Sequence, residues 1–161
     1  MGCSESKEKP PEPKLRKREQ SKTPAAKIVL LGEAGVGKSS ICQRYINNHV
    51  SEYYEVTIGG AYMQKEVMTS IGQKITLHIW DTGGEERYKA MAPLYYRDAH
   101  AVLLVYDITN KRTFKMLNYW IRELEDRVQT EGLVIVCAGN KCDLAAKAVE
   151  DRKSTRLNSS H

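Results

Sequence analysis

The feature that most restricts the fold is the segment 32–39, which reads Gly-Glu-Ala-Gly-Val-Gly-Lys-Ser and matches the pattern GxxxxGK[ST]. It follows a short apolar strand predicted at 27–31 and opens a segment with helical apolar spacing, which is the context that a phosphate-binding loop requires. Glycines let backbone N–H groups turn toward phosphates, and the helix N-terminus adds a favourable dipole. The segment therefore predicts a nucleotide-binding loop, with contacts from Ala34, Gly35, Val36, Gly37, Lys38, Ser39 and Ser40.

Strand and helix patterns alternate along the rest of the chain. Segments 60–69 and 74–80 flank a short turn and predict a hairpin, and the apolar runs 101–106 and 133–138 predict buried strands. This alternation predicts an α/β fold with a doubly wound, mostly parallel sheet, whose ligands bind outside the carboxyl ends of the strands. Between the last two strands, apolar residues at helical spacing predict one amphipathic helix: Phe114, Leu117, Ile121, Leu124 and Val128.

Two further motifs follow predicted strands. Asp81 ends the second hairpin strand, where a carboxylate can hold the water shell of Mg²⁺, and Gly84 can approach a terminal phosphate closely. Segment 140–143 reads Asn-Lys-Cys-Asp, in which Asp143 can accept two hydrogen bonds from guanine. Adenine lacks that donor pair and would leave a carboxylate unpaired, so the site selects guanine.

The net charge of +5 is concentrated at the two ends of the chain. Residues 1–24 hold seven basic and four acidic side chains, residues 151–161 hold three and one, and the 15 basic and 15 acidic residues of 25–150 cancel. The domain therefore carries no basic surface for nucleic acid, and residues 1–24, rich in Lys, Glu, Ser and Pro, predict a flexible arm.

The four cysteines and four histidines do not form a zinc pattern. We expect reduced thiols, two of them in or near the core. No apolar run reaches the length of about 20 residues that spans a bilayer, and we expect no cleavable signal, so the chain is predicted to be cytosolic or on the cytosolic face of a membrane.

These three motifs, in this order, resemble those of the Ras-superfamily GTPases. Segments 57–62, 80–88, 95–99 and 105–109 narrow the resemblance to the Rab family over about residues 25–150. Stretches 92–97 and 139–149 are most similar to the early-endosomal group. The resemblance implies a GTP-hydrolysing switch that controls vesicle traffic from the cytoplasmic face of endosomal or other vesicular membranes, with a cytosolic pool. Its partners would be GTP or GDP, effectors, an exchange factor and a GTPase-activating protein.

The resemblance also implies roles for particular residues. Thr57 would be the switch I threonine that closes on Mg²⁺ and the terminal phosphate, so the metal site would comprise Ser39, Thr57 and Asp81. Switch II would run from Asp81 through about Pro93. Nucleotide contacts would extend to Thr57, Gly84, Asn140, Lys141 and Asp143, and effectors would read Ile58, Tyr62, Trp80 and Tyr95.

The chain departs from the family at the hydrolytic position. Where the family has Ala-Gly-Gln, this chain has Gly83, Gly84 and Glu85. A carboxylate is repelled by the γ-phosphate, yet it can also accept a proton from water if its pKa is raised. We expect altered, slower hydrolysis with Glu85, Gly84 and Lys38 as the catalytic set; the alternative is a GTP-dependent scaffold that does not hydrolyse.

The N-terminus departs as well. Residues 1–6 read Met-Gly-Cys-Ser-Glu-Ser and fit M-G-x-x-x-[ST], so Gly2 is a candidate for myristoylation and Cys3 for palmitoylation. Basic residues at 14–18 would reinforce such an anchor. Most Rab proteins are prenylated at the C-terminus instead, although an endosomal subgroup of plants and protists is acylated at the N-terminus.

The C-terminal part carries two expectations. A Rab domain continues beyond the guanine motif with a helix, a sixth strand and a final helix, and residues 144–161 do not provide them. Residues 151–161 resemble the translation of a sequencing-library adapter, so we expect a non-native tail after a domain that is incomplete at its C-terminal side and folds and binds nucleotide weakly.

Overall fold

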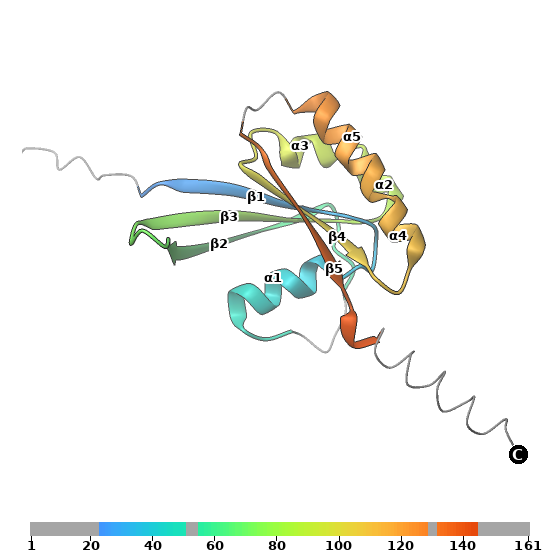
Figure 1. Cartoon of the computed structure of the whole chain (residues 1–161), viewed down its shortest axis with the longest axis horizontal. Helices are drawn as coiled ribbons and strands as arrows, with labels where there is room; N and C mark the ends of the chain where they lie inside the picture. Colours follow the sequence, from blue (N-terminus) through green and yellow to red (C-terminus); the bar gives the residue numbers. More distant parts are fainter. Residues whose placement is uncertain (1–22, 51–54, 129–131, 145–161) are drawn as a thin grey trace, which may run out of the picture.

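A five-stranded sheet with helices on both faces forms the described part of the computed structural model, residues 23–50, 55–128 and 132–144 (Figure 1). The strand order is β2-β3-β1-β4-β5. Four strands run parallel, and only β2 is antiparallel, to its hairpin partner β3. This confirms the predicted α/β class. The strands are β1 Ala25–Leu31, β2 Gly60–Met68, β3 Lys74–Thr82, β4 Ala101–Asp107 and β5 Val134–Asn140.

The predicted hairpin is present, and its turn follows from local hydrogen bonds. The Thr69 N–H donates to the Gln73 carbonyl at 2.8 Å, and the Gln73 N–H donates back to Thr69 Oγ1 at 3.0 Å. Gly72 has a φ of 76°, a conformation that glycine adopts without strain. The turn sets a register in which Met68 faces Lys74 at one end of the hairpin and Gly60 faces Thr82 at the other.

Alternate residues of β1 point into two separate apolar clusters, as the two-residue period of a strand requires. Val29 and Leu31 pack with Trp120 and Leu124 on one face of the sheet. Leu30 packs with Cys42 on the other. Both faces of β1 are therefore buried, which explains why the strand reads as a continuous apolar run.

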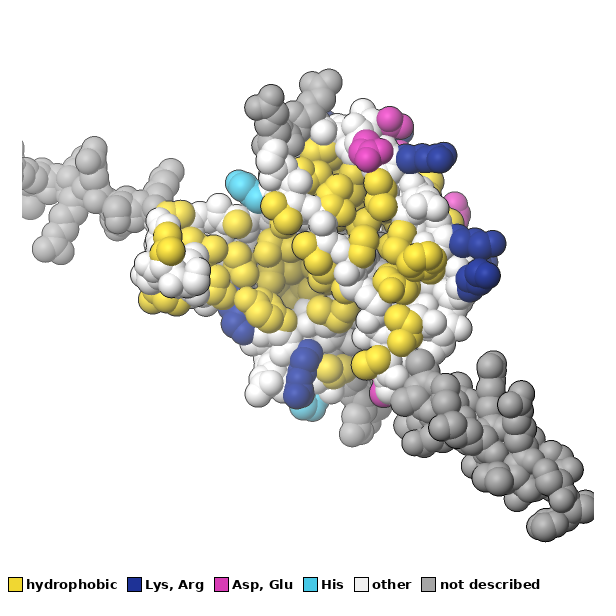
Figure 2. Space-filling model, viewed as in Figure 1, with side chains coloured by type: hydrophobic (Ala, Val, Ile, Leu, Met, Phe, Trp, Pro, Cys, Tyr) yellow, Lys and Arg dark blue, Asp and Glu magenta, His cyan; other side chains and the backbone are white. Residues whose placement is uncertain are grey.

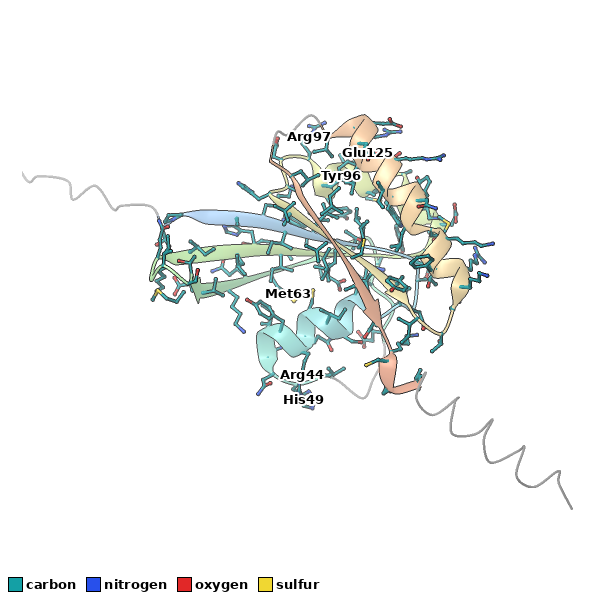
Figure 3. The ribbon with its side chains drawn as sticks, in the orientation of Figure 1. Arg44, His49, Met63, Tyr96, Arg97 and Glu125 are labelled. Carbon is teal, nitrogen blue, oxygen red and sulfur yellow. The ribbon has the colours of Figure 1, made fainter. Side chains whose placement is uncertain are left out.

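The helices divide between the two faces (Figure 1). Helix α1 covers one face and contacts β3, while α3 contacts β3 and α5 contacts β4 from the other face. Tyr96, buried in α3, donates a 2.9 Å hydrogen bond to Glu123 of α5, which also pairs with Arg127. Figure 3 shows Tyr96 beside these two helices. The helices are α1 Lys38–Asn47, α2 Glu86–Lys89, α3 Ala92–Tyr96, α4 Lys111–Lys115 and α5 Leu117–Arg127.

The prediction of a single helix after β4 is wrong for the first turn of that helix. Two helices, α4 and α5, meet at Met116, and Phe114 is 55% exposed instead of joining the apolar face. Asn110 caps α4 by accepting from the Arg112 N–H, and the buried Thr113 hydroxyl bonds to Asp107 and Asn110. Thr113 thus takes the inward position, and Phe114 turns outward against the Tyr106 ring, at 5.2 Å between centroids.

The prediction that the last strand is buried is also wrong. The first four residues of β5 are exposed, and within the described residues the strand pairs with β4 alone. Val134, Ile135 and Val136 of β5 are exposed. Figure 2 shows hydrophobic surface across the middle of the molecule, where β5 crosses the same view in Figure 1. An apolar run identifies a strand, but it does not say whether other elements cover it.

The cysteine expectation is corrected in the same region. Cys42 is buried, and burial raises its pKa to about 12. Cys137 and Cys142 are exposed, so one described thiol, not two, lies in the core, and Cys3 lies outside the described residues. None of the described helices has the length and apolar character needed to cross a bilayer.

Candidate functional site

The loop between β1 and α1 is held at the centre of the sheet. Its Val36 side chain is fully buried, and Gly37 has a φ of 97° immediately before the helix begins. The positive φ strains any other residue here, and a Cβ at Gly37 would lie 2.2 Å from the Asn140 amide nitrogen, which would have to move. Ala34, Gly35 and Ser40 belong to the same loop and first helical turn, as the sequence predicted.

Lys38 points back over this loop. Its side chain is 5% exposed, and its ammonium donates to the carbonyls of Gly32 and Glu33, both at 2.9 Å. Burial lowers the pKa of Lys38 to about 8, although the nearby Asp81 and Glu33 carboxylates oppose the shift. A cation held in this way lies where outer phosphates would need neutralisation.

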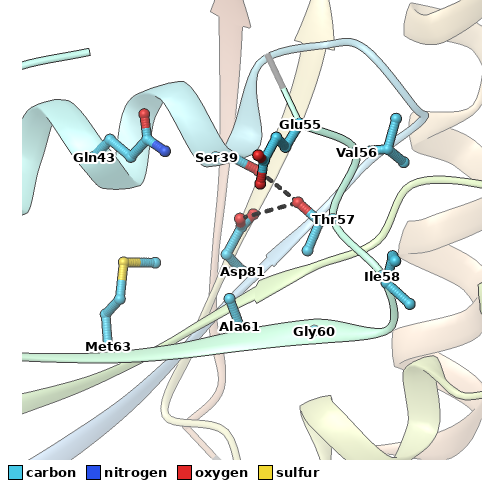
Figure 4. A pocket seen from close by; sticks show the side chains of 10 residues that line it. All are labelled: Ser39, Gln43, Glu55, Val56, Thr57, Ile58, Gly60, Ala61, Met63 and Asp81. Carbon is cyan, nitrogen blue, oxygen red and sulfur yellow. Dashed lines mark hydrogen bonds between the residues drawn. The ribbon is translucent and has the colours of Figure 1, made fainter. Parts of the chain in front are cut away.

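Three oxygen-bearing side chains from separate elements converge beside the loop (Figure 4). Ser39 Oγ of α1 lies 2.8 Å from Thr57 Oγ1, and Thr57 Oγ1 donates to Asp81 Oδ2 of β3 at 3.5 Å. The other carboxylate oxygen of Asp81, Oδ1, is buried and has no hydrogen-bond partner within the described residues. Hydroxyl and carboxylate oxygens are the ligands that Mg²⁺ prefers, so this donor set fits the ion.

The electrostatics of Asp81 agree with that fit. The residue is 2% exposed, and its burial raises its pKa. Hydrogen bonds from Ser39 and Thr57 and the positive charge of Lys38 oppose this shift but do not cancel it. A buried carboxylate with an unpartnered oxygen is costly unless a cation joins it. No cluster of three or more His, Cys, Asp or Glu ligands exists among the described residues. A metal held by Asp81 would therefore need other oxygen ligands, and the hydroxyls of Ser39 and Thr57 are the nearest to it.

Gly84 lies against the phosphate loop. A Cβ at this position would come within 2.5 Å of backbone atoms of Glu33 and Ala34. The segment after β3 can therefore approach the loop this closely only through a glycine. Gly83 is similarly confined, because its Cβ would meet the Thr57 carbonyl at 2.7 Å.

Glu85 is paired with a cation in this structure. Its carboxylate lies 2.6 Å from Arg87 Nε, and its side chain is 32% exposed. Glu85 immediately precedes the short helix α2, so both partners lie in the predicted switch II. This ion pair holds the carboxylate that replaces the family's glutamine, and nothing in the sequence motif signalled it.

Sequence reasoning also missed an ionic cluster that joins the loop to α2. The Glu33 carboxylate lies 3.2 Å from Lys89 and 3.9 Å from Arg112, and Lys89 also bonds Glu86 at 2.9 Å. Burial of Lys89 is outweighed by its bonds to Glu86 and Glu33, so its pKa is raised. Glu33 occupies an unspecified position of the loop motif, and only its position inside the loop could have drawn attention to it.

The guanine motif follows β5 at the same edge of the sheet. The Asn140 amide donates to the Val36 carbonyl at 2.8 Å. Lys141, with a φ of 68°, lies 2.8 Å from Asp107, and this bond is the main reason that the pKa of Asp107 is lowered. Asp143 is exposed. Asn140 and Lys141 are thus anchored to the loop and to β4, and Asp143 is free to face a ligand.

Three of the four predicted effector residues form one aromatic surface on β2, β3 and α3: Tyr62, Trp80 and Tyr95. The Tyr62 and Trp80 rings lie 5.2 Å apart, and the Trp80 and Tyr95 rings 5.8 Å. Tyr62 also hydrogen-bonds His78 at 2.6 Å, and Ile58 is 79% exposed. The predicted lipidation sites Gly2 and Cys3 lie outside the described residues.

Comparison with known proteins agrees with this arrangement. Residues 27–161 match the Ras family. The chain belongs to the Ras family. Members of this family are GTPases, and the relatives of this Ras-family chain are Rab5-like proteins.

Three such relatives are similar over most of this chain. The Ras-related protein Rab-5B of Plasmodium falciparum is 41% identical over 156 residues, which are 91% of this chain and 75% of that protein. The GTP-binding protein ypt5 of Schizosaccharomyces pombe is 45% identical over 126 residues, covering 77% of this chain and 59% of that protein. The Ras-related protein Rab-5A of Dictyostelium discoideum is 46% identical over 121 residues, covering 75% and 59%. The matched part of the chain thus spans 59% to 75% of the length of these relatives.

Proposed function

We propose that this Ras-family chain is a GTP-dependent switch of endosomal membrane traffic. The observation that carries the proposal is the convergence of Ser39, Thr57 and Asp81 beside the phosphate loop, with Asp81 Oδ1 buried and unpartnered within the described residues. Ser39, Thr57 and Asp81 would hold Mg²⁺, which would supply positive charge to offset the charge of the outer phosphates. The early-endosomal assignment rests on the similarity to Rab5-like proteins.

The chain's own residues would bind and orient the nucleotide. Lys38 would exchange its two carbonyl bonds for phosphate oxygens, and the backbone of 34–40 would supply N–H donors. Thr57 would close switch I on the terminal phosphate, and the N–H of Gly84 would bring switch II to it. Loss of that phosphate would release both segments and the effector surface around Tyr62, Trp80 and Tyr95. An exchange factor and a GTPase-activating protein would then set the proportions of the GTP-bound and GDP-bound forms.

Selection of guanine would rest on Asp143, with Asn140 and Lys141 as its support. We expect the chain to bind GTP and GDP and to discriminate against ATP by several orders of magnitude. Competition of unlabelled GTP and ATP against a fluorescent GDP analogue tests this directly. Equal displacement by the two nucleotides would refute a guanine site.

Hydrolysis is proposed to be slow, because Glu85 places a carboxylate at the position whose side chain would orient the attacking water. The Glu85–Arg87 pair, at 2.6 Å, offsets the repulsion between this carboxylate and a terminal phosphate. The same pair favours a second candidate function, a GTP-dependent scaffold that does not hydrolyse, because a carboxylate that is bonded to Arg87 is less available to orient the attacking water.

Single-turnover hydrolysis separates these two candidates. We expect Glu85→Gln to hydrolyse bound GTP faster than the parent, by about tenfold, with or without a GTPase-activating protein. Equal rates would mean that Glu85 does not limit hydrolysis. No measurable hydrolysis by the parent, even with an activating protein, would favour the scaffold.

We further propose that Gly2 is myristoylated and Cys3 palmitoylated. One acyl chain gives only marginal membrane binding, and the second chain or the basic residues at 14–18 would make it stable. Gly2→Ala should move the protein from the membrane fraction to the soluble fraction of cells that produce it. Unchanged partitioning would refute the acyl anchor.

A further inference from the structure

The end of the β2–β3 hairpin is an exposed apolar projection that the proposed switch does not use. We call residues 68–73 the hairpin tip. Ile71 is 82% exposed and Met68 66% exposed, the highest and third-highest values among the large apolar side chains of the described residues. Residues 67–73 carry no charge, and the charged residues that flank them in the sequence, Glu66 and Lys74, form an ion pair at 2.6 Å.

The hairpin tip lies beside the place where the N-terminal arm joins the sheet. The Thr76 N–H donates to the Pro24 carbonyl at 2.8 Å, and Ala25 is in register with Thr76. The arm therefore reaches the domain two residues along β3 from Lys74, where the hairpin turn ends. Figure 1 shows the start of β1 and the hairpin turn at the same end of the molecule.

The switch residues lie at the opposite end of the same strands. β3 runs from Lys74 beside the tip to Asp81 and Thr82 at the nucleotide site, a span of roughly 27 Å for its nine residues. A surface that held the hairpin tip would leave the phosphate loop and both switches facing solvent. Contact at the tip is thus compatible with nucleotide exchange and effector binding.

We propose that the hairpin tip is a second membrane contact, with Ile71 and Met68 entering the interfacial region of the bilayer to which the N-terminal arm is anchored. The occupant is a lipid surface because the tip is uncharged and apolar and adjoins an arm with a net charge of +3 that carries the proposed acylation sites. Insertion of two apolar side chains adds to the marginal binding of one acyl chain. The inference rests on the N-terminal acylation proposed above.

Flotation of the N-myristoylated chain with phosphatidylcholine vesicles containing phosphatidylserine tests the contact. We expect Ile71→Ser to lower the vesicle-bound fraction about tenfold, and the double change with Met68→Ser to lower it further, since the lost contacts are apolar. Leu94→Ser is the matched control: Leu94 is 65% exposed on α3, outside the tip, and its change should leave binding unaltered. All three side chains are exposed, so the variants should fold like the parent.

Gly2→Ala keeps the two proposals distinguishable. If Gly2→Ala abolishes vesicle binding and Ile71→Ser leaves it unchanged, acylation stands and the tip contact is wrong. If Gly2→Ala has no effect on vesicle binding, the acyl chain does not anchor the protein, and the membrane anchor proposed above is wrong. If Leu94→Ser weakens binding as much as Ile71→Ser, the apolar contribution is not specific to the tip and the inference is overturned. In nanodiscs that contain a gadolinium-chelating lipid, the amide signals of Ile71 and Gly72 should broaden more than that of Leu94; the reverse order would also overturn it.

Discussion

The two halves of the nucleotide site are built on very different supports. The phosphate half stands on central strands: Lys38 and Asp81 are 5% and 2% exposed, and β1 and β3 each have neighbours on both sides. The base half stands on β5, whose first four residues are exposed and which pairs with β4 alone within the described residues. The proposed phosphate and metal contacts would therefore rest on the core, whereas the proposed selection of guanine would depend on an exposed edge strand.

The largest effect on the contrast between the two halves of the site is expected when the buried cation of the phosphate half, Lys38, is removed. Lys38→Ala should lower GTP affinity by about a hundredfold or more, equivalent to ~3 kcal/mol, because a buried charge that pairs with phosphate is lost. Titration with a fluorescent GDP analogue measures the change. Lys115→Ala, an exposed change on α4, is the control and should bind like the parent; a Lys38→Ala loss below about fivefold would contradict the predicted role.

A smaller effect is expected from the base half. Asp143→Asn should weaken GTP binding by about ten- to a hundredfold and leave ATP binding unchanged, since one charge-assisted pair of hydrogen bonds to guanine is removed. Competition with both nucleotides checks the result, and Asp126→Asn on α5 serves as the control. An equal loss for the two nucleotides would show that the change acts through folding instead of base recognition.

The same contrast predicts unequal costs in stability. Val102→Ala on β4, where the side chain is 1% exposed, should lower the free energy of unfolding by about 2 kcal/mol. Val136→Ala on β5, where it is 50% exposed, should cost less than about 0.5 kcal/mol. Urea unfolding followed by circular dichroism measures both; similar costs would mean that β5 is covered in solution.

The smallest effect concerns the ion pair that ties the base half to β4. The pKa of Asp107 is lowered, chiefly by its bond to Lys141, so the ionised form is favoured in the folded state. Its contribution to stability is present above the unfolded-state pKa of about 4 and is lost as the pH falls below it. Asp107→Asn should therefore be less stable than the parent at neutral pH, and the difference should shrink as the pH falls below about 4. Urea unfolding over that pH range measures it, and a difference that stays constant would exclude the linkage.

The sequence predicted the central features of the fold because they depend on local patterns. The loop motif, the hairpin turn at 69–73 and the alternation of strands and helices are each encoded within a few residues. The site residues that the motifs named lie at one edge of the sheet, since the carboxyl ends of parallel strands meet there.

The features that were missed depend on contacts between distant segments. Phe114 has the spacing of a buried helical residue, yet the capping of α4 by Asn110 and the inward bonds of Thr113 turn it outward. β5 reads as a buried strand, but burial depends on what covers it. Arg87 and Lys89 pair with Glu85 and Glu33. Arg87 lies within segment 80–88, but the resemblance gave it no role, and Lys89 lies outside the segments that carry the resemblance.

The hydrogen bond from Asn140 to the Val36 carbonyl has a thermodynamic consequence. It joins an exposed edge strand to a buried loop, so a ligand that holds the loop also holds β5. Each tenfold excess of free nucleotide over its Kd adds about 1.4 kcal/mol to the stability of every element that must be folded for binding. The amide protons of β5 should consequently exchange with solvent more slowly when nucleotide is bound, because the bound ligand stabilises this strand through the loop.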